Sequence, residues 1–106
     1  MTIYNNASVA VTVVNIQIYW NPSSPAGQKL KIIKLGGVNI WSSESTTSPL
    51  NVSSFIGDVT IPAGSNELLQ VTFDKNYKNT GVERILVTFA QNGCPIVDSN
   101  NAGQLP

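Results

Sequence analysis

The chain has 106 residues, with six basic and six acidic side chains, a formal net charge of zero and no histidine. This length fits one domain with a single core, and the neutral balance offers no field to attract nucleic acid or an anionic membrane. Without histidine, the chain lacks the commonest general base. Charged residues make up only 11% of the chain, against roughly 25% in most soluble domains. The polar surface is therefore built mainly from Ser, Thr, Asn and Gln, as is common in secreted and cell-surface β proteins.

The first 20 residues alternate apolar and polar side chains in the manner of β-strands. We predict a short edge strand around Ile3 and Tyr4 and a long strand over residues 8–20. Apolar residues occupy odd positions up to Val13 and even positions from Val14 to Trp20. Because side chains alternate strictly in a regular strand, this change predicts either a β-bulge or a crossing from one sheet to the other, and we favour one long bulged strand. The parity of its second half places Trp20 in the core.

Turn-forming residues divide the middle of the chain. Two prolines and a glycine predict a loop over residues 21–27. Gly36-Gly37 predicts a tight hairpin turn between strands over residues 29–35 and 38–41. Residues 42–49 are polar and of low complexity, which predicts a loop, and another strand is expected over residues 50–56.

We expect residues 58–73 to be the stretch around which the chain is organised. Two alternating apolar runs lie on either side of a cluster that contains Pro62 and Gly64. Proline presets φ for a turn and glycine tolerates positive φ, so the chain can leave one sheet here and enter another. The pattern predicts a strand, a corner and a second strand.

The last part of the chain contains the clearest strand pattern, over residues 82–90. Asn92-Gly93 predicts a hairpin turn, residues 94–97 a closing strand, and residues 99–106 a linker or tail after a single domain of residues 1–98. About seven short strands, regularly spaced turns and no convincing helix predict an all-β, antiparallel β-sandwich.

Four segments resemble those of immunoglobulin-like β-sandwich domains in bacterial extracellular proteins, some of which follow pilin-like N-terminal segments. They are the β-branched strand that ends in Trp20-Asn21-Pro22 and the stretches LKIIKLGGVNIW, GDVTIPAGSNELLQVTF and RILVTFAQNGCPI. The resemblance implies a secreted or surface module and carries no catalytic residue. If the protein is exported, its export signal or anchor lies outside this sequence, which has no apolar stretch of the roughly 20 residues that span a bilayer.

Carboxylates and one cysteine are the candidates for catalysis. Paired carboxylates can hydrolyse glycosidic bonds, but no other catalytic group accompanies these, so solvated or turn-capping acids are the favoured interpretation. The six are Glu44, Asp58, Glu67, Asp74, Glu83 and Asp98. Cys94 has no histidine to activate it; we interpret it as a small buried residue, with pairing between chains as the lesser alternative. An enzyme is not expected.

Two kinds of binding site are weaker alternatives. Asp74 and Asn76 offer oxygen ligands for calcium, although Lys75 lies between them and an ordinary turn is favoured. Trp41, together with Tyr19 and Tyr77, could stack on sugar rings, although core or strand-end packing is favoured for these aromatic residues.

The preferred function is a non-catalytic structural or adhesive module of a secreted or cell-surface bacterial protein. Such a module would act through sheet packing and through edge strands that pair with other protein modules or with copies of itself. The alternative is a carbohydrate-binding module that uses exposed aromatic residues. We expect no cofactor, no nucleic acid partner and no membrane contact by this part of the protein.

Overall fold

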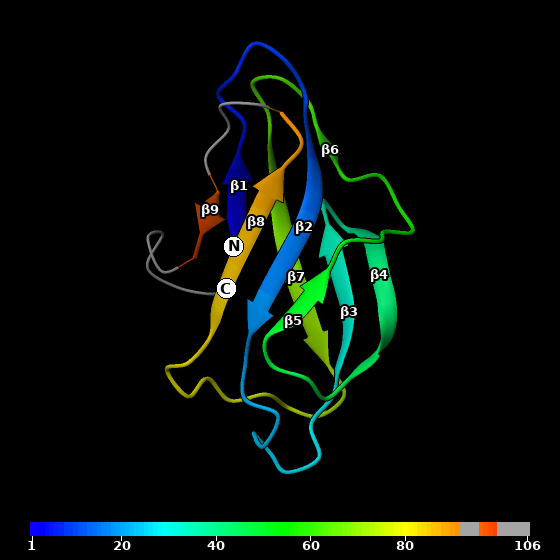
Figure 1. Ribbon diagram of the computed structural model, residues 1–106, viewed down its shortest axis with the longest axis vertical. Coiled ribbons are helices and arrows are strands. Elements are labelled where there is room, and N and C mark those ends of the chain that lie inside the picture. The colour runs from blue at the N-terminus through cyan, green and yellow to red at the C-terminus, as the bar shows by residue number, and fades with distance from the viewer. Residues whose placement is uncertain (92–95, 100–106) are drawn as a thin grey trace.

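The computed structural model describes residues 1–91 and 96–99, and these residues form nine β-strands and no helix (Figure 1). The strands are β1 (Thr2–Tyr4), β2 (Val11–Tyr19), β3 (Leu30–Leu35), β4 (Val38–Ser45), β5 (Leu50–Val52), β6 (Thr60–Ile61), β7 (Asn66–Phe73), β8 (Arg84–Phe89) and β9 (Val97–Asp98). The predicted all-β class is confirmed, with nine strands in place of about seven.

The strands form two antiparallel sheets that pack face to face. One sheet has the order β1-β7-β3-β4, and the other has the order β5-β2-β8-β9, with β6 also paired to β2. Buried apolar side chains from both sheets fill the space between them, among them Ile16, Ile33, Leu69, Ile85 and Val87. The molecule is therefore an antiparallel β-sandwich, as the alternating pattern predicts.

The corner predicted within residues 58–73 is confirmed. Strand β6 pairs with β2 in one sheet, whereas β7 lies between β1 and β3 in the other. A turn joins them, in which Gly64 has a φ of +70° and the Ser65 amide donates to the Pro62 carbonyl at 3.2 Å. A positive φ favours glycine, so the sequence specifies where the chain crosses between sheets.

A buried asparagine ties this corner to the connection between β1 and β2. The Asn5 side-chain amide donates to the carbonyls of Val9 at 2.9 Å, Ile61 at 3.0 Å and Pro62 at 3.1 Å. Its backbone amide donates to the Ser65 carbonyl at 2.8 Å. Because Asn5 is only 4% exposed, these bonds satisfy polar groups that water does not reach readily.

The bulge predicted in the long strand is also confirmed. Val13 pairs with Phe89 and Asn15 with Thr88, so the register against β8 shifts around Val14. Val14 is exposed, while Trp20 is buried as expected. The extra residue moves the apolar side chains from odd to even positions while both halves of β2 still face the core.

Several predicted strand boundaries are wrong. Strand β2 begins at Val11 and not at residue 8, and β8 begins at Arg84 and not at residue 82. Strand β4 continues to Ser45, so residues 42–45 belong to a strand where a loop was predicted, because backbone pairing with β3 extends to Leu30 opposite Ser45. Strand β5 ends at Val52, so residues 53–56 of the predicted strand form a connection.

The predicted C-terminal hairpin falls partly outside the described residues, which exclude Asn92, Gly93 and Cys94. Beyond this gap, β9 pairs with β8. Ser99, the first residue of the predicted tail, is buried, and its hydroxyl oxygen accepts a hydrogen bond from the Ile85 amide at 2.7 Å.

Candidate functional site

The three aromatic residues predicted to bind sugars lie in different parts of the sandwich. Tyr19, at the end of β2, pairs with Arg84 and is half-buried. Trp41 is on β4 in the other sheet, and Tyr77 is in the connection between β7 and β8. No ring contact joins any two of these three residues. The structure therefore does not assemble them into one stacking surface.

A second bulge explains the orientation of Trp41. On β3, Ile33 and Lys34 are adjacent, but their partners on β4 are Trp41 and Asn39, so Ile40 is an extra residue. Ile40 is fully buried, and Trp41 is half-buried and packed against the core. Strict alternation puts Trp41 on the face opposite Ile40, but the bulge turns both toward the core.

A pocket of about 240 Å³ opens between the two sheets at one end of the sandwich. Strands β2, β7 and β8 form its walls, and the connection between β7 and β8 covers it. Its lining residues are Ile18, Trp20, Leu69, Val71, Phe73, Tyr77, Asn79 and Ile85. None of them is charged, and Asn79 is the exposed member of the set.

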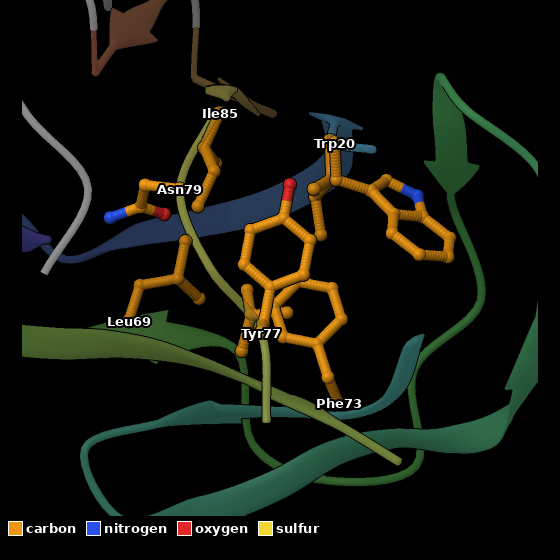
Figure 2. A pocket seen from close by; sticks show the side chains of 8 residues that line it. Trp20, Leu69, Phe73, Tyr77, Asn79 and Ile85 are labelled. Carbon is orange, nitrogen blue, oxygen red and sulfur yellow. The ribbon is translucent and has the colours of Figure 1, made fainter. Parts of the chain in front are cut away.

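Aromatic rings form one side of this pocket. Tyr77 stacks on Phe73 with ring centroids 4.1 Å apart and an angle of 14° between the planes, and Trp20 lies 5.4 Å from Phe73 at 45°. Figure 2 shows Tyr77 between Trp20 on one side and Leu69 and Asn79 on the other. The stacked and tilted contacts join the three rings into one aromatic wall.

Hydrogen bonds hold the Tyr77 ring in place. Its hydroxyl accepts a bond from the Asn21 amide at 2.8 Å and donates to the Glu83 carboxylate. Glu83 in turn accepts bonds from the backbone amides of Thr80 and Gly81, each at 2.9 Å, and from the Thr80 hydroxyl at 3.0 Å. We call this pair of side chains the Tyr77–Glu83 latch, because it closes the β7–β8 connection on itself.

Both partners of the latch have displaced pKa values. Burial raises the pKa of Tyr77 to about 12, together with the hydrogen bond to Glu83. Burial favours a higher pKa for Glu83 as well, but hydrogen bonds from Tyr77 and Thr80 outweigh it and lower this pKa to about 2. At neutral pH the latch therefore joins a neutral phenol to a charged carboxylate.

The sequence predicts Glu83 only as one of six solvated or turn-capping acids. In the structure it also accepts a hydrogen bond from the Tyr77 hydroxyl. A signal for its capping role exists, since Thr80 and Glu83 have the spacing of a capping box, in which a glutamate reaches back to a backbone amide three residues earlier. The bond to Tyr77 has no such local signature.

Two of the other acids form ion pairs. Lys31 and Lys29 lie 3.3 Å and 3.5 Å from Glu44 and lower its pKa, the hydrogen bond from Lys31 contributing most. Asp98 forms an ion pair of 2.6 Å with Arg84. None of the six carboxylates lines the pocket.

The candidate calcium residues lie in the connection between β7 and β8. Asp74 and Asn76 are both exposed, and the Asp74 backbone amide donates to the Lys29 carbonyl at 2.9 Å. In residues 1–91 and 96–99, no three acidic or cysteine side chains form a group that could hold a metal ion.

Strand β4 is the one long edge of the sandwich among the described residues. It has β3 on one side only, and the other edge strands, β1, β5, β6 and β9, have three, three, two and two residues against eight in β4. The Ile56 amide donates to the Ile40 carbonyl at 2.8 Å and so covers the first half of the edge. Residues 41–45 form the open half, where Ser42, Ser43 and Glu44 are exposed. We call residues 41–45 the open edge.

Comparisons with protein-family models, with curated proteins and with solved structures find no match for this chain. Over the described part of the chain, no helix has the length and apolar character needed to cross a membrane.

Proposed function

We propose that this chain is a non-catalytic structural or adhesive module of a secreted or cell-surface bacterial protein, and that it associates with further copies of itself through the open edge of β4. The bacterial and extracellular parts of the proposal rest on the resemblance stated above and on the scarcity of charged residues, at 11% of the chain.

The open edge is the observation that carries the proposal. A strand with a neighbour on one side only presents unpaired backbone amides and carbonyls, which a strand from another molecule can pair with. Natural domains usually shorten or cover such edges, as β1, β5 and β9 are shortened here and as Ile56 covers the first half of β4. No described residue bonds to the outer side of residues 41–45 in this way, and their exposed serines offer no bulk against an incoming strand.

The carbohydrate-binding alternative has less support. A sugar platform needs two or more exposed aromatic rings on one face. Here Trp20 is buried, Trp41 packs against the core, and Tyr19 and Tyr77 lie in other parts of the fold.

Sedimentation velocity over a range of protein concentrations tests the proposal. The natural chain is expected to sediment as larger species as its concentration rises. Ser43→Lys places a charge in the open edge, where lysine opposes strand pairing, and should return the protein to a monomer. Ser8→Lys is the matched control, because Ser8 is equally an exposed serine but lies in the connection between β1 and β2.

A natural chain that stays monomeric at every concentration would contradict the proposal, as would equal effects of the two lysine variants. The extracellular part has its own test, since antibodies to the folded domain should bind intact cells or culture fluid of the source organism. Detection only after lysis would overturn that part.

A further inference from the structure

We propose that the pocket between the sheets binds a small, neutral aromatic molecule that carries one hydrogen-bonding group, such as a substituted phenol. This function is independent of the open edge, because the pocket is built from β2, β7, β8 and the connection between β7 and β8.

The size of the pocket sets the size of the ligand. The pocket is partly open to solvent, and its volume of about 240 Å³ limits the molecule that it can enclose. A dry engineered cavity of roughly 150 Å³ is known to hold benzene, and pockets for drug-sized ligands begin at roughly 300 Å³. The space therefore suits a single substituted ring.

The walls select for an uncharged ring. Trp20, Phe73 and Tyr77 supply aromatic surfaces, and Ile18, Leu69 and Ile85 supply aliphatic ones. A ring entering beside Tyr77 would extend the series of ring contacts that already joins Trp20 to Phe73 and Phe73 to Tyr77. No charged side chain lines the pocket to offset the cost of removing an ion from water.

Asn79 provides the polar contact. The Tyr77 hydroxyl is already engaged by Asn21 and Glu83, and the Trp20 ring nitrogen donates to the Thr47 carbonyl at 2.8 Å. The Asn79 side-chain amide, by contrast, makes no hydrogen bond to any described residue, although it lines the pocket at its exposed side. An amide can both donate and accept, which matches a hydroxyl group on the ligand.

Titration of isotope-labelled protein with 4-methylphenol tests the proposal by NMR. Ring currents should shift the methyl signals of Ile18, Leu69 and Ile85 in a saturable way. Two probes of similar size serve as comparisons: 4-methylcyclohexanol lacks the aromatic ring, and 4-methylbenzoate carries a negative charge. Each should bind at least about tenfold more weakly, because one loses ring stacking and the other brings a charge into an apolar site. Absence of saturable shifts, shifts confined to other surfaces, or equal binding of all three probes would overturn the proposal.

Two variants locate the site. Val71→Phe fills the pocket and should abolish the shifts, whereas Leu68→Phe, at an exposed position three residues earlier on β7, should leave them unchanged. If Val71→Phe does not fold, Asn79→Ala decides instead. It should weaken binding of 4-methylphenol about fivefold and leave the affinity for toluene unchanged, since one hydrogen bond is lost. Unchanged binding of 4-methylphenol to Asn79→Ala would contradict the assigned contact.

Discussion

Replacing Tyr77 with phenylalanine removes a single hydroxyl and opens the Tyr77–Glu83 latch. The hydroxyl donates to a charged carboxylate, a bond worth about 1.5–3 kcal/mol, and accepts one from the Asn21 amide, worth about 1 kcal/mol. Because Tyr77 and Asn21 are only partly buried, water replaces part of the lost hydrogen bonding. We expect the free energy of unfolding to fall by about 2 kcal/mol. For a domain of this size that is a fall of roughly 10 °C in Tm.

The pH dependence of this contribution follows from the two pKa values. Glu83 has a pKa of about 2 in the folded chain against an ordinary 4.5, so its contribution is fully present above about pH 5 and is lost as the pH falls toward 2. Tyr77 has a raised pKa of about 12 against 10, so its contribution is present below pH 10 and is lost as the pH rises through 12. The carboxylate shift corresponds to at most about 3 kcal/mol, which solvent at this loop reduces to about 1–2 kcal/mol.

Urea unfolding of a double-mutant cycle measures the latch directly. Tyr77→Phe, Glu83→Gln and the double variant should show a coupling energy of about 1 kcal/mol at pH 7 that disappears near pH 2. Tyr19→Phe is the control, because that half-buried tyrosine makes no hydrogen bond to a described residue and should change stability by less than about 0.5 kcal/mol. Additive effects at pH 7, or a coupling that persists near pH 2, would refute the reasoning.

Two further substitutions test the contacts that position the corner and the β4 edge. Gly57→Ala should cost about 1–3 kcal/mol in chemical denaturation, because an added Cβ would lie 2.6 Å from the Asn39 carbonyl oxygen; a cost below about 0.5 kcal/mol would contradict this packing. Asn5→Ala should lower the free energy of unfolding by about 2–3 kcal/mol, since it removes the donor of a buried bond to the Ile61 carbonyl and of a partly buried bond to the Pro62 carbonyl. Exposed Asn6→Ala should be nearly neutral, and equal effects of the two alanine variants would count against the role given to Asn5.

The corner and the bulge in β2 are predictable because their causes are local. Proline restricts the backbone at its own position and glycine allows a positive φ there, so Pro62 and Gly64 mark the crossing between sheets. The bulge appears as a change of parity between Val13 and Val14, since residues on both sides of it must face the same core.

The second bulge and the true end of β4 are not predictable in this way. Ser42 and Ser43 have no apolar alternation, and they join the strand because the partner strand β3 continues alongside them. The orientation of Trp41 depends on the extra residue at Ile40, which is visible only in the register between β3 and β4. Tertiary pairing decides both features.

The candidate site, too, is only partly predictable from the sequence. The sequence identifies Trp20 as a core residue and places Glu83 among six solvated or turn-capping acids, but the pocket arises from three strands and a connection that are distant along the chain. Tyr77 and Glu83 are six residues apart, and only the folded connection brings the hydroxyl to the carboxylate.

Residue-resolved hydrogen exchange at low and high protein concentration is the most direct test of association through the open edge. We predict that those amides of residues 41–45 that do not bond to β3 exchange rapidly in the dilute protein and become protected as its concentration rises, while amides in β1, β5 and β9 do not change. Protection that is independent of concentration, or that appears on another edge strand, would contradict it.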